Sequence, residues 1–259
     1  MNQSERRELL IRRLLDEDRR FRGTEIPSGE EEQRRLLRAL MNIRAPAQAD
    51  EGLLRVQDEY LSEETRQKGI TDLDDLVPAC GGLYLWQGDI TTLRCDAIVN
   101  AANSGMTGCY VPNHRCIDNC IHTYAGIQLR LDCARIMEEQ GHEEPTGQAK
   151  ITHAYNLPCR YVLHTVGPVI TGRVRAADRE LLASCYRSCL VLAAENGLES
   201  VAFCCISTGE FRFPNRDAAE IAVRTVREFM EKETGVRRVV FNVFKDRDRE
   251  IYGRLLGEC

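Results

Sequence analysis

Two cysteines and a histidine lie within eight residues of one another and could together bind a metal ion. Cys109, His114 and Cys116 form the pattern Cys-x4-His-x-Cys, in which two thiolates and an imidazole converge on one ion if the chain curls. Sulfur and nitrogen donors of this kind favour Zn²⁺, and three protein ligands leave a fourth tetrahedral position open for water or substrate. Cys120 or His122 would instead close the site as a fourth ligand. The spacing matches no standard zinc finger, so ordinary thiols are the competing interpretation.

Two further segments carry side chains that suit a nucleotide or a sugar, and each follows a short apolar run. Asp89 and Ile90 follow the run 83–86, and the aspartate can accept a hydrogen bond from an amino group. On its own, this aspartate is more simply interpreted as a helix N-cap or a turn residue. Asn103 follows the run 97–99, and its amide group suits the vicinal hydroxyls of a sugar, although a polar turn would use it equally well.

A third polar loop follows the apolar run 201–206 and could bind a phosphate. A Ser-Thr-Gly turn that leads toward a helix offers backbone N–H groups and hydroxyls to an anion, and an aromatic residue beside it can stack on a ribose or simply pack. It contains no Walker motif and no G-x-G-x-x-G. The loop comprises Ser207, Thr208, Gly209, Glu210 and Phe211.

The elements that must position these loops alternate between strands and helices from Gly81 onward. This alternation predicts an α/β domain with helices on both sides of a sheet, and ligands of such sheets bind beyond the carboxyl ends of the strands. The expected strands are 83–86, 97–99, 149–154, 161–166, 201–206 and 239–244, and the expected helices are 118–140, 176–196, 216–233 and 247–256.

The first 80 residues have a different character, with many Arg, Glu and Leu and no cysteine before Cys80. Leucines at i, i+3 and i+4 predict amphipathic helices around residues 9–15 and 36–41, and a third helix is expected within 51–68. A capping box at Ser28–Glu31 would begin the second helix. We therefore predict a helical N-terminal extension over 1–80, which packs on one domain over 81–259. A partner-docking arm is the alternative role for the extension.

Composition excludes several classes of protein. The chain has 259 residues, a net charge of −5 and a pI near 5.7, which argues against general affinity for nucleic acid or an anionic membrane. No apolar run is long enough for a membrane span, and the charged N-terminus has no secretory h-region. Twelve cysteines in such a chain are expected to be free thiols or metal ligands. The expected location is the reducing cytoplasm.

Taken together, "GDIT", "AIVNAAN" and "CISTG-x-F-x-FP", in this order, resemble a macrodomain, the ADP-ribose-binding fold. The resemblance covers about two thirds of the chain and implies a three-layer α/β/α fold with a mixed central sheet. It also implies that Asp89 meets the adenine amino group beside the backbone of Ile90. Main-chain N–H groups of the loop 207–210 would bind the diphosphate, Asn103 would contact the distal ribose, and Phe211 would border that ribose.

One departure from the family pattern bears on chemistry. The MacroD-like hydrolases carry a glycine-rich run followed by "VDGxIHxxAG"; here Asp118 and His122 remain, and the glycine run is replaced by the Cys-x4-His-x-Cys segment. In this respect the chain is similar to the zinc-containing macrodomains, which also have a helical N-terminal extension. The resemblance implies one zinc ion per chain, bound by Cys109, His114 and Cys116 near the distal ribose.

The resemblance further implies an activity and partners. Zinc-containing macrodomains are commonly encoded beside class M sirtuins and a lipoyl carrier that resembles glycine-cleavage H protein, which suggests a modified carrier as the protein substrate. The expected reaction is zinc-dependent hydrolysis of mono-ADP-ribose from a protein side chain, most plausibly an ester-linked Asp or Glu. Asn103 would hold the ribose and Asp118 would orient or deprotonate the nucleophile, while zinc would activate water or hold the substrate.

Three alternative functions remain open from the sequence. A non-catalytic ADP-ribose reader would need Asp89 and the loop 207–210 but neither zinc nor Asp118. An O-acyl-ADP-ribose deacylase would use the same pocket on a small ester. A structural zinc module that recruits a sirtuin or a carrier would have a closed site with four ligands.

Overall fold

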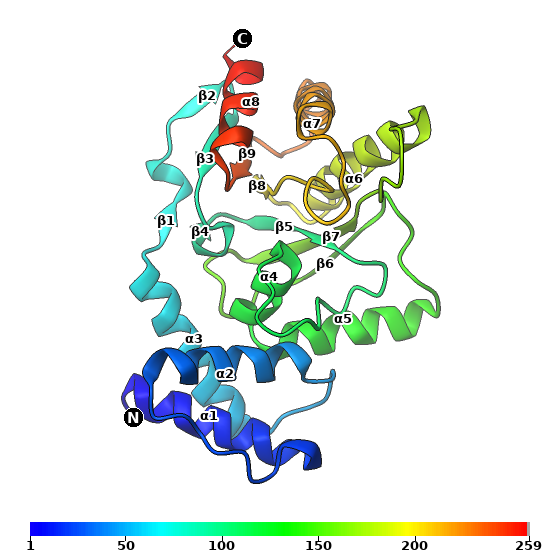
Figure 1. Cartoon of the computed structure of the whole chain (residues 1–259). Coiled ribbons are helices and arrows are strands. Elements are labelled where there is room, and N and C mark those ends of the chain that lie inside the picture. Colours follow the sequence, from blue (N-terminus) through cyan, green and yellow to red (C-terminus); the bar gives the residue numbers. More distant parts are fainter. Residues whose placement is uncertain (258–259) are drawn as a thin grey trace.

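A seven-stranded mixed sheet forms the centre of the structure and has helices on both faces (Figure 1). The computed structural model describes residues 1–257, so residues 258 and 259 of the predicted domain lie outside the described residues. The strands are β1 (Thr71–Asp72), β2 (Pro78–Cys80), β3 (Leu83–Gln87), β4 (Leu93–Arg94), β5 (Ala97–Ala102), β6 (Ala149–His153), β7 (Tyr161–Val166), β8 (Ser200–Phe203) and β9 (Arg238–Val243).

The sheet has the order β2-β3-β9-β8-β5-β7-β6, and β1 pairs separately with β4. The five inner strands are parallel, whereas β2 and β6 are antiparallel to their neighbours at the two edges. This arrangement confirms the predicted three-layer α/β fold with a mixed sheet. Because β3, β5 and β8 are parallel, the three polar loops that follow them lie on the same side of the sheet, beyond the carboxyl ends of its strands.

The inner strands form because their side chains are apolar on both faces. All six residues of β9 except the first are buried, as are the four residues of β8. Such near-continuous apolar runs are typical of parallel strands that helices cover on both sides. The helices are α1 (Gln3–Glu17), α2 (Glu30–Ile43), α3 (Glu51–Lys68), α4 (Ile117–Ala125), α5 (Ile127–Gln140), α6 (Ala176–Glu195), α7 (Asn215–Met230) and α8 (Asp246–Leu256).

The helical layers lie as Figure 1 shows: α4 and α5 cover one face of the sheet, and α6 and α7 cover the other. The single helix predicted over 118–140 is divided into α4 and α5 by Gly126. Gly126 has φ +105°, and a Cβ atom there would lie 2.7 Å from Nε2 of Gln57 in α3. The break therefore allows α3 to approach the start of α5, a requirement that helical periodicity does not reveal.

The N-terminal extension has a hydrophobic cluster of its own and packs against the α4 and α5 side of the domain (Figure 1). Ile127 of α5 joins this cluster and links it to the domain. The predicted capping box at Ser28–Glu31 is wrong, because Gly29 is the N-cap of α2 and provides no side-chain hydrogen bond. The buried leucine stripe of the extension consists of Leu10, Leu14, Leu15, Leu37, Leu40, Leu53 and Leu61.

Ten cysteines within the described residues are free, but Cys80 is disulfide-bonded and so departs from the expectation of thiols or metal ligands throughout. Among the described helices, none is long and apolar enough to cross a membrane.

Candidate active site

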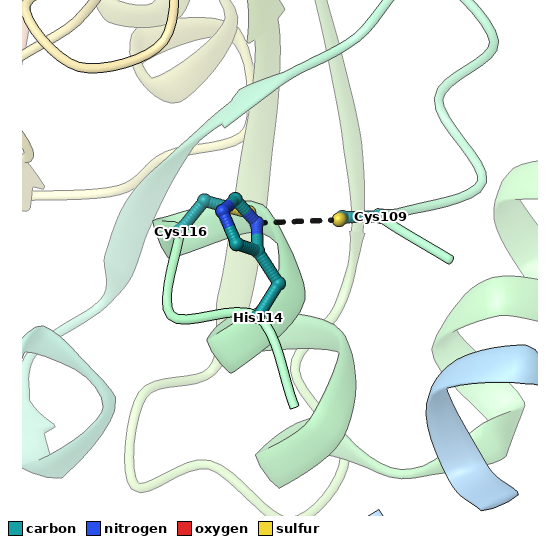
Figure 2. Close-up of side chains that lie close together, drawn as sticks. All are labelled: Cys109, His114 and Cys116. Atoms are coloured by element: carbon teal, nitrogen blue, oxygen red, sulfur yellow. Dashed lines mark hydrogen bonds between the residues drawn. The ribbon is translucent and has the colours of Figure 1, made fainter. Parts of the chain in front are cut away.

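Cys109, His114 and Cys116 converge as their spacing predicts. Their potential ligand atoms all lie within 4.8 Å of one another, and Figure 2 shows the three side chains gathered at one point of the loop. Cys109 Sγ is 3.5 Å from His114 Nδ1. Cys116 is the N-cap of α4, so the first turn of that helix fixes the position of its thiol.

The geometry of this cluster fits a zinc ion. Tetrahedral bonds of about 2.3 Å to sulfur and about 2.0 Å to nitrogen place the two ligand atoms roughly 3.5 Å apart, which matches the separation of Cys109 Sγ and His114 Nδ1. Burial raises the pKa of the Cys116 thiol to about 12 in the metal-free protein. A cation at the cluster would reverse that shift, because zinc binds cysteine as the thiolate.

Neither of the residues proposed as a fourth ligand belongs to this cluster in the described chain. Cys120 Sγ instead accepts a hydrogen bond from Arg38 Nη2 at 3.4 Å. His122 belongs to a second, fully buried group with Cys133 and His164. His164 is already hydrogen-bonded there, to Asn100 at 3.1 Å and Thr152 at 2.9 Å. The first cluster thus offers three potential protein ligands, the number typical of an open, catalytic-type zinc site.

Asp118 lies two residues after Cys116, and its carboxylate is buried in a network of amides. Asn100 Nδ2 donates to Asp118 Oδ1 at 2.8 Å, and Asn103 Nδ2 donates to Asp118 Oδ2 at 3.2 Å. His122 Nε2 lies 3.6 Å from Oδ1. Burial raises the pKa of Asp118 to about 6, and the two amide donors oppose that rise. The carboxylate is therefore held in one orientation by both of its oxygens.

Asn103 connects this carboxylate to the cysteine-containing loop. Its amide donates to the carbonyl of Gly108 at 3.1 Å as well as to Asp118, and the residue itself is exposed. Gly108 is required at this point, since a Cβ atom there would lie 2.7 Å from the ring of His122. Asn103 can therefore reach a ligand at the surface while it stays connected to the buried network.

The loop after β8 presents backbone N–H groups that no acceptor in residues 1–257 uses. The N–H groups of Ser207, Gly209, Glu210 and Phe211 make no hydrogen bond there, whereas that of Thr208 donates to the carbonyl of Cys205 at 3.3 Å. Ser207 has φ +64°, a conformation in which successive N–H groups form an anion-binding concavity. Four of the five N–H groups in the predicted phosphate loop are thus free to bind an anion.

Two contacts fix this loop relative to the rest of the site. A Cβ atom on Gly167, which follows β7, would lie 2.0 Å from Ser207 Oγ, so only glycine allows the loop to pack so closely. On the outer side, Glu210 Oε1 lies 3.7 Å from His114 Nε2. The structure therefore brings the predicted phosphate loop and the metal-ligand cluster together.

Asp89 and Ile90 lie at the end of β3, away from the cysteine-containing loop. Asp89 caps the short 3₁₀ helix Ile90–Thr92, and its Oδ1 accepts from the backbone N–H of Thr91 at 3.0 Å and from its hydroxyl. Its Oδ2 lies 3.6 Å from Lys68 Nζ of α3, and the side chain is 40% exposed. The helix-cap interpretation is confirmed, and Oδ2, which faces Lys68, accepts no hydrogen bond within the described residues. Ile90 is buried.

Two residues that the sequence did not single out hold the cysteine-containing loop in place through hydrogen bonds. Asn119 is fully buried and donates to the carbonyls of Cys109 and Val111. Arg38 of α2 donates to the carbonyl of His114 at 2.8 Å and to Asn119 Oδ1 at 2.9 Å. The sequence could have pointed to Asn119, because it lies three residues after the predicted ligand Cys116. Nothing in the sequence pairs Arg38 with a loop 76 residues away.

A second residue of α2 repeats this pattern. The backbone N–H of Asn113 donates to Asn42 Oδ1 at 2.9 Å, and Asn42 Nδ2 donates to Thr123 of α4 at 2.9 Å. Arg130 of α5 donates to the carbonyls of Asn42 and Arg44, which ties the end of α2 to the domain. The N-terminal extension is therefore part of the framework of the site.

Comparison with known proteins gives close relatives along almost the whole chain. The Macro domain family model matches residues 99–222. A protein-ADP-ribose hydrolase of Treponema medium is 59% identical over 99% of this chain and 100% of its own length. A protein-ADP-ribose hydrolase of Staphylococcus aureus strain MSSA476 is 53% identical over 88% of this chain and 86% of its own length.

Solved structures show the same fold. A variant of the Oceanobacillus iheyensis macrodomain, solved with ADPR, is 38% identical with a TM-score of 0.63 and covers 68% of this chain and 92% of its own. The Trypanosoma brucei macrodomain in complex with ADP-ribose is 32% identical with a TM-score of 0.65 and covers 85% of this chain and 95% of its own.

Proposed function

Because this chain belongs to the macrodomain family, we propose that it is a zinc-dependent hydrolase that removes mono-ADP-ribose from modified proteins. The bond cleaved joins the distal ribose to an amino-acid side chain, with an ester-linked Asp or Glu as the favoured class. The observation that carries the proposal is the juxtaposition of a three-ligand cluster with a buried, doubly anchored carboxylate. Support also comes from relatives of nearly full length that are named protein-ADP-ribose hydrolase.

The ADP-ribose group would bind beyond the carboxyl ends of the parallel strands. Oδ2 of Asp89 would accept a hydrogen bond from the adenine amino group beside Ile90. The free N–H groups around Ser207–Phe211 would bind the diphosphate, where fixed dipoles cost no reorganisation. Asn103 would contact the hydroxyls of the distal ribose and Phe211 would border that ribose, which places its anomeric carbon near Asp118.

Asp118 would orient the water that attacks the anomeric carbon. Its two oxygens accept hydrogen bonds from Asn100 and Asn103, which hold the carboxylate in one orientation. Water adds at that carbon as the bond to the ester oxygen breaks, and the products are ADP-ribose and the free side-chain carboxyl group. Zinc held by Cys109, His114 and Cys116 would supply a Lewis acid close to the reacting bond.

The finer elements of the proposal are the metal and the substrate. One zinc ion per chain is expected from the donor set. The resemblance to the zinc-containing macrodomains suggests, as the modified protein, a lipoyl carrier similar to glycine-cleavage H protein that a class M sirtuin modifies. An ADP-ribose reader and an O-acyl-ADP-ribose deacylase are the alternatives, and both would use the same binding residues.

Metal analysis combined with a turnover assay tests the proposal. The purified protein should contain about one zinc per chain and release ADP-ribose from a protein modified on Asp or Glu, and a chelator should abolish release until zinc is restored. Zinc without release, together with retained ADP-ribose binding, would instead support the reader. Release that persists after complete zinc removal would refute the dependence on metal.

A further inference from the structure

A groove of about 720 Å³ lies between the N-terminal extension and the domain. Helices α2 and α3 form one wall, and α4 with the segment that precedes it forms the other. Near its α3 end, Lys68 Nζ lies 3.1 Å from the ring centroid of Tyr124 and 3.6 Å from Asp89. Its opposite wall includes Asn113 and Arg115.

The groove is adjacent to the metal-ligand cluster because the two share one segment of chain. Asn113 and Arg115 line the groove, while the residues that alternate with them, His114 and Cys116, belong to the cluster. The segment 113–116 thus separates the groove from the cluster. If the ADP-ribose group of a modified protein binds beyond the carboxyl ends of the parallel strands, the polypeptide that carries this group would lie close to the segment 113–116.

The charge of the groove is opposite to that of the molecule. Five cationic and two anionic side chains line it, whereas the whole chain has a net charge of −5. The anionic residues are Glu31 and Glu64, and the second is paired with Arg34. The cationic residues are Arg34, Arg35, Arg38, Lys68 and Arg115.

Two of these cations are available to a partner. Arg35 and Arg115 are exposed, and neither has an ion pair or a side-chain hydrogen bond within residues 1–257. The others are already engaged: Arg34 pairs with Glu64, Arg38 donates to the loop behind the cluster, and Lys68 faces Asp89. Unpaired guanidinium groups on both walls favour a carboxylate-rich ligand, because Arg binds carboxylates through two parallel hydrogen bonds.

We propose that this groove binds an acidic segment of the ADP-ribosylated protein, beside the modified side chain. The proposal rests on the proposed hydrolase function and adds the part of the protein substrate that the enzyme recognises. Charge complementarity selects an acidic segment over a neutral or basic one. It also makes recognition sensitive to salt, since exposed charges are screened beyond about 8 Å at physiological ionic strength.

The test compares two variants that change net charge equally. Arg35→Glu/Arg115→Glu reverses the available charges in the groove, and Arg224→Glu/Arg254→Glu reverses two exposed charges on α7 and α8. The probes are fluorescein-labelled 12-residue peptides, one rich in Glu and one with Gln in place of each Glu, measured by anisotropy without any ADP-ribose. Zinc content and circular dichroism of each variant serve as controls for the loop and the fold.

We expect the parent and the α7/α8 variant to bind the Glu-rich peptide, and the groove variant to bind it about tenfold more weakly. The same groove variant should raise KM for a mono-ADP-ribosylated Glu-rich peptide while kcat and the affinity for free ADP-ribose stay unchanged. Equal binding of the Glu and Gln peptides, or equal loss in both variants, would overturn the proposal. Since the anisotropy measurement needs no turnover, failure of the hydrolase function would appear separately, as binding without release.

Discussion

Arg38 is predicted to control metal affinity although it is not a ligand. Its guanidinium, on α2, donates from Nη2 to the carbonyl of His114 at 2.8 Å and to Asn119 Oδ1 at 2.9 Å. Arg38→Met retains a long aliphatic side chain for packing and removes these hydrogen bonds, together with the one to Cys120 Sγ. The loop between Cys109 and Cys116 would then lose its support from the extension.

The size of the effect follows from these two hydrogen bonds. A hydrogen bond to a charged group contributes about 1.5–3 kcal/mol, so loss of the bonds to His114 and Asn119 sets an upper scale of roughly 3–6 kcal/mol. Asn119 still donates to the carbonyls of Cys109 and Val111, so part of the loop order remains. Loss of a residue that orients metal ligands lowers metal affinity by roughly 10–100-fold, or about 1.4–2.7 kcal/mol. We expect a loss in that range.

Zinc affinity is measured by competition with a chromophoric chelator, which does not depend on turnover. Arg35→Met is the matched control, since Arg35 lies on the same helix but is exposed and makes no contact with the loop. It should leave zinc affinity unchanged. If Arg38→Met, folded by circular dichroism, bound zinc within about twofold of the parent, the extension would not hold the ligands and the reasoning would be refuted.

Three further predictions concern other parts of the site. Asp118→Asn keeps the shape of the side chain but removes the carboxylate; release of ADP-ribose should fall at least about 100-fold, while calorimetry shows nearly unchanged ADP-ribose binding, and retention of activity would exclude Asp118 from catalysis. Gly167→Ala should displace Ser207 and weaken ADP-ribose binding about tenfold, because fixed N–H groups act only in the correct geometry; unchanged affinity would show that the loop adapts. Gly126→Ala should lower the free energy of unfolding by about 1–3 kcal/mol, and by more than Gly69→Ala, which has φ +89° and meets no neighbour within 4 Å; equal losses in urea unfolding would count against a packing effect.

The parts of the structure that follow from local pattern were predictable. Apolar runs identified the inner strands β5, β7, β8 and β9, and leucine spacing identified the helices of the extension. The residues of the site also came from local motifs, since the loops after β3, β5 and β8 all follow parallel strands, which end on the same side of the sheet. The convergence of Cys109, His114 and Cys116 needed only that a short loop should curl.

The parts that depend on contacts between distant segments were not predictable. The break at Gly126 serves the approach of Gln57, which is 69 residues earlier in the sequence. The support that Arg38 gives to the cysteine-containing loop likewise needs the docked position of α2. The sequence of the extension gives no sign that its charges share a groove, and only the packing of α2 and α3 against α4 shows that some of them line one.

The hydrogen bonds from α2 to the backbone of residues 113 and 114 have a consequence for how long a metal ion would stay bound. Asn42 accepts from the backbone of Asn113 and Arg38 donates to that of His114, so the ligand loop cannot open widely unless α2 moves. The extension has its own hydrophobic cluster, and regions of this kind open as separate cooperative units. The frequency of that opening would set the rate of metal exchange, and a bound ion would in turn slow hydrogen exchange of the amides in α2.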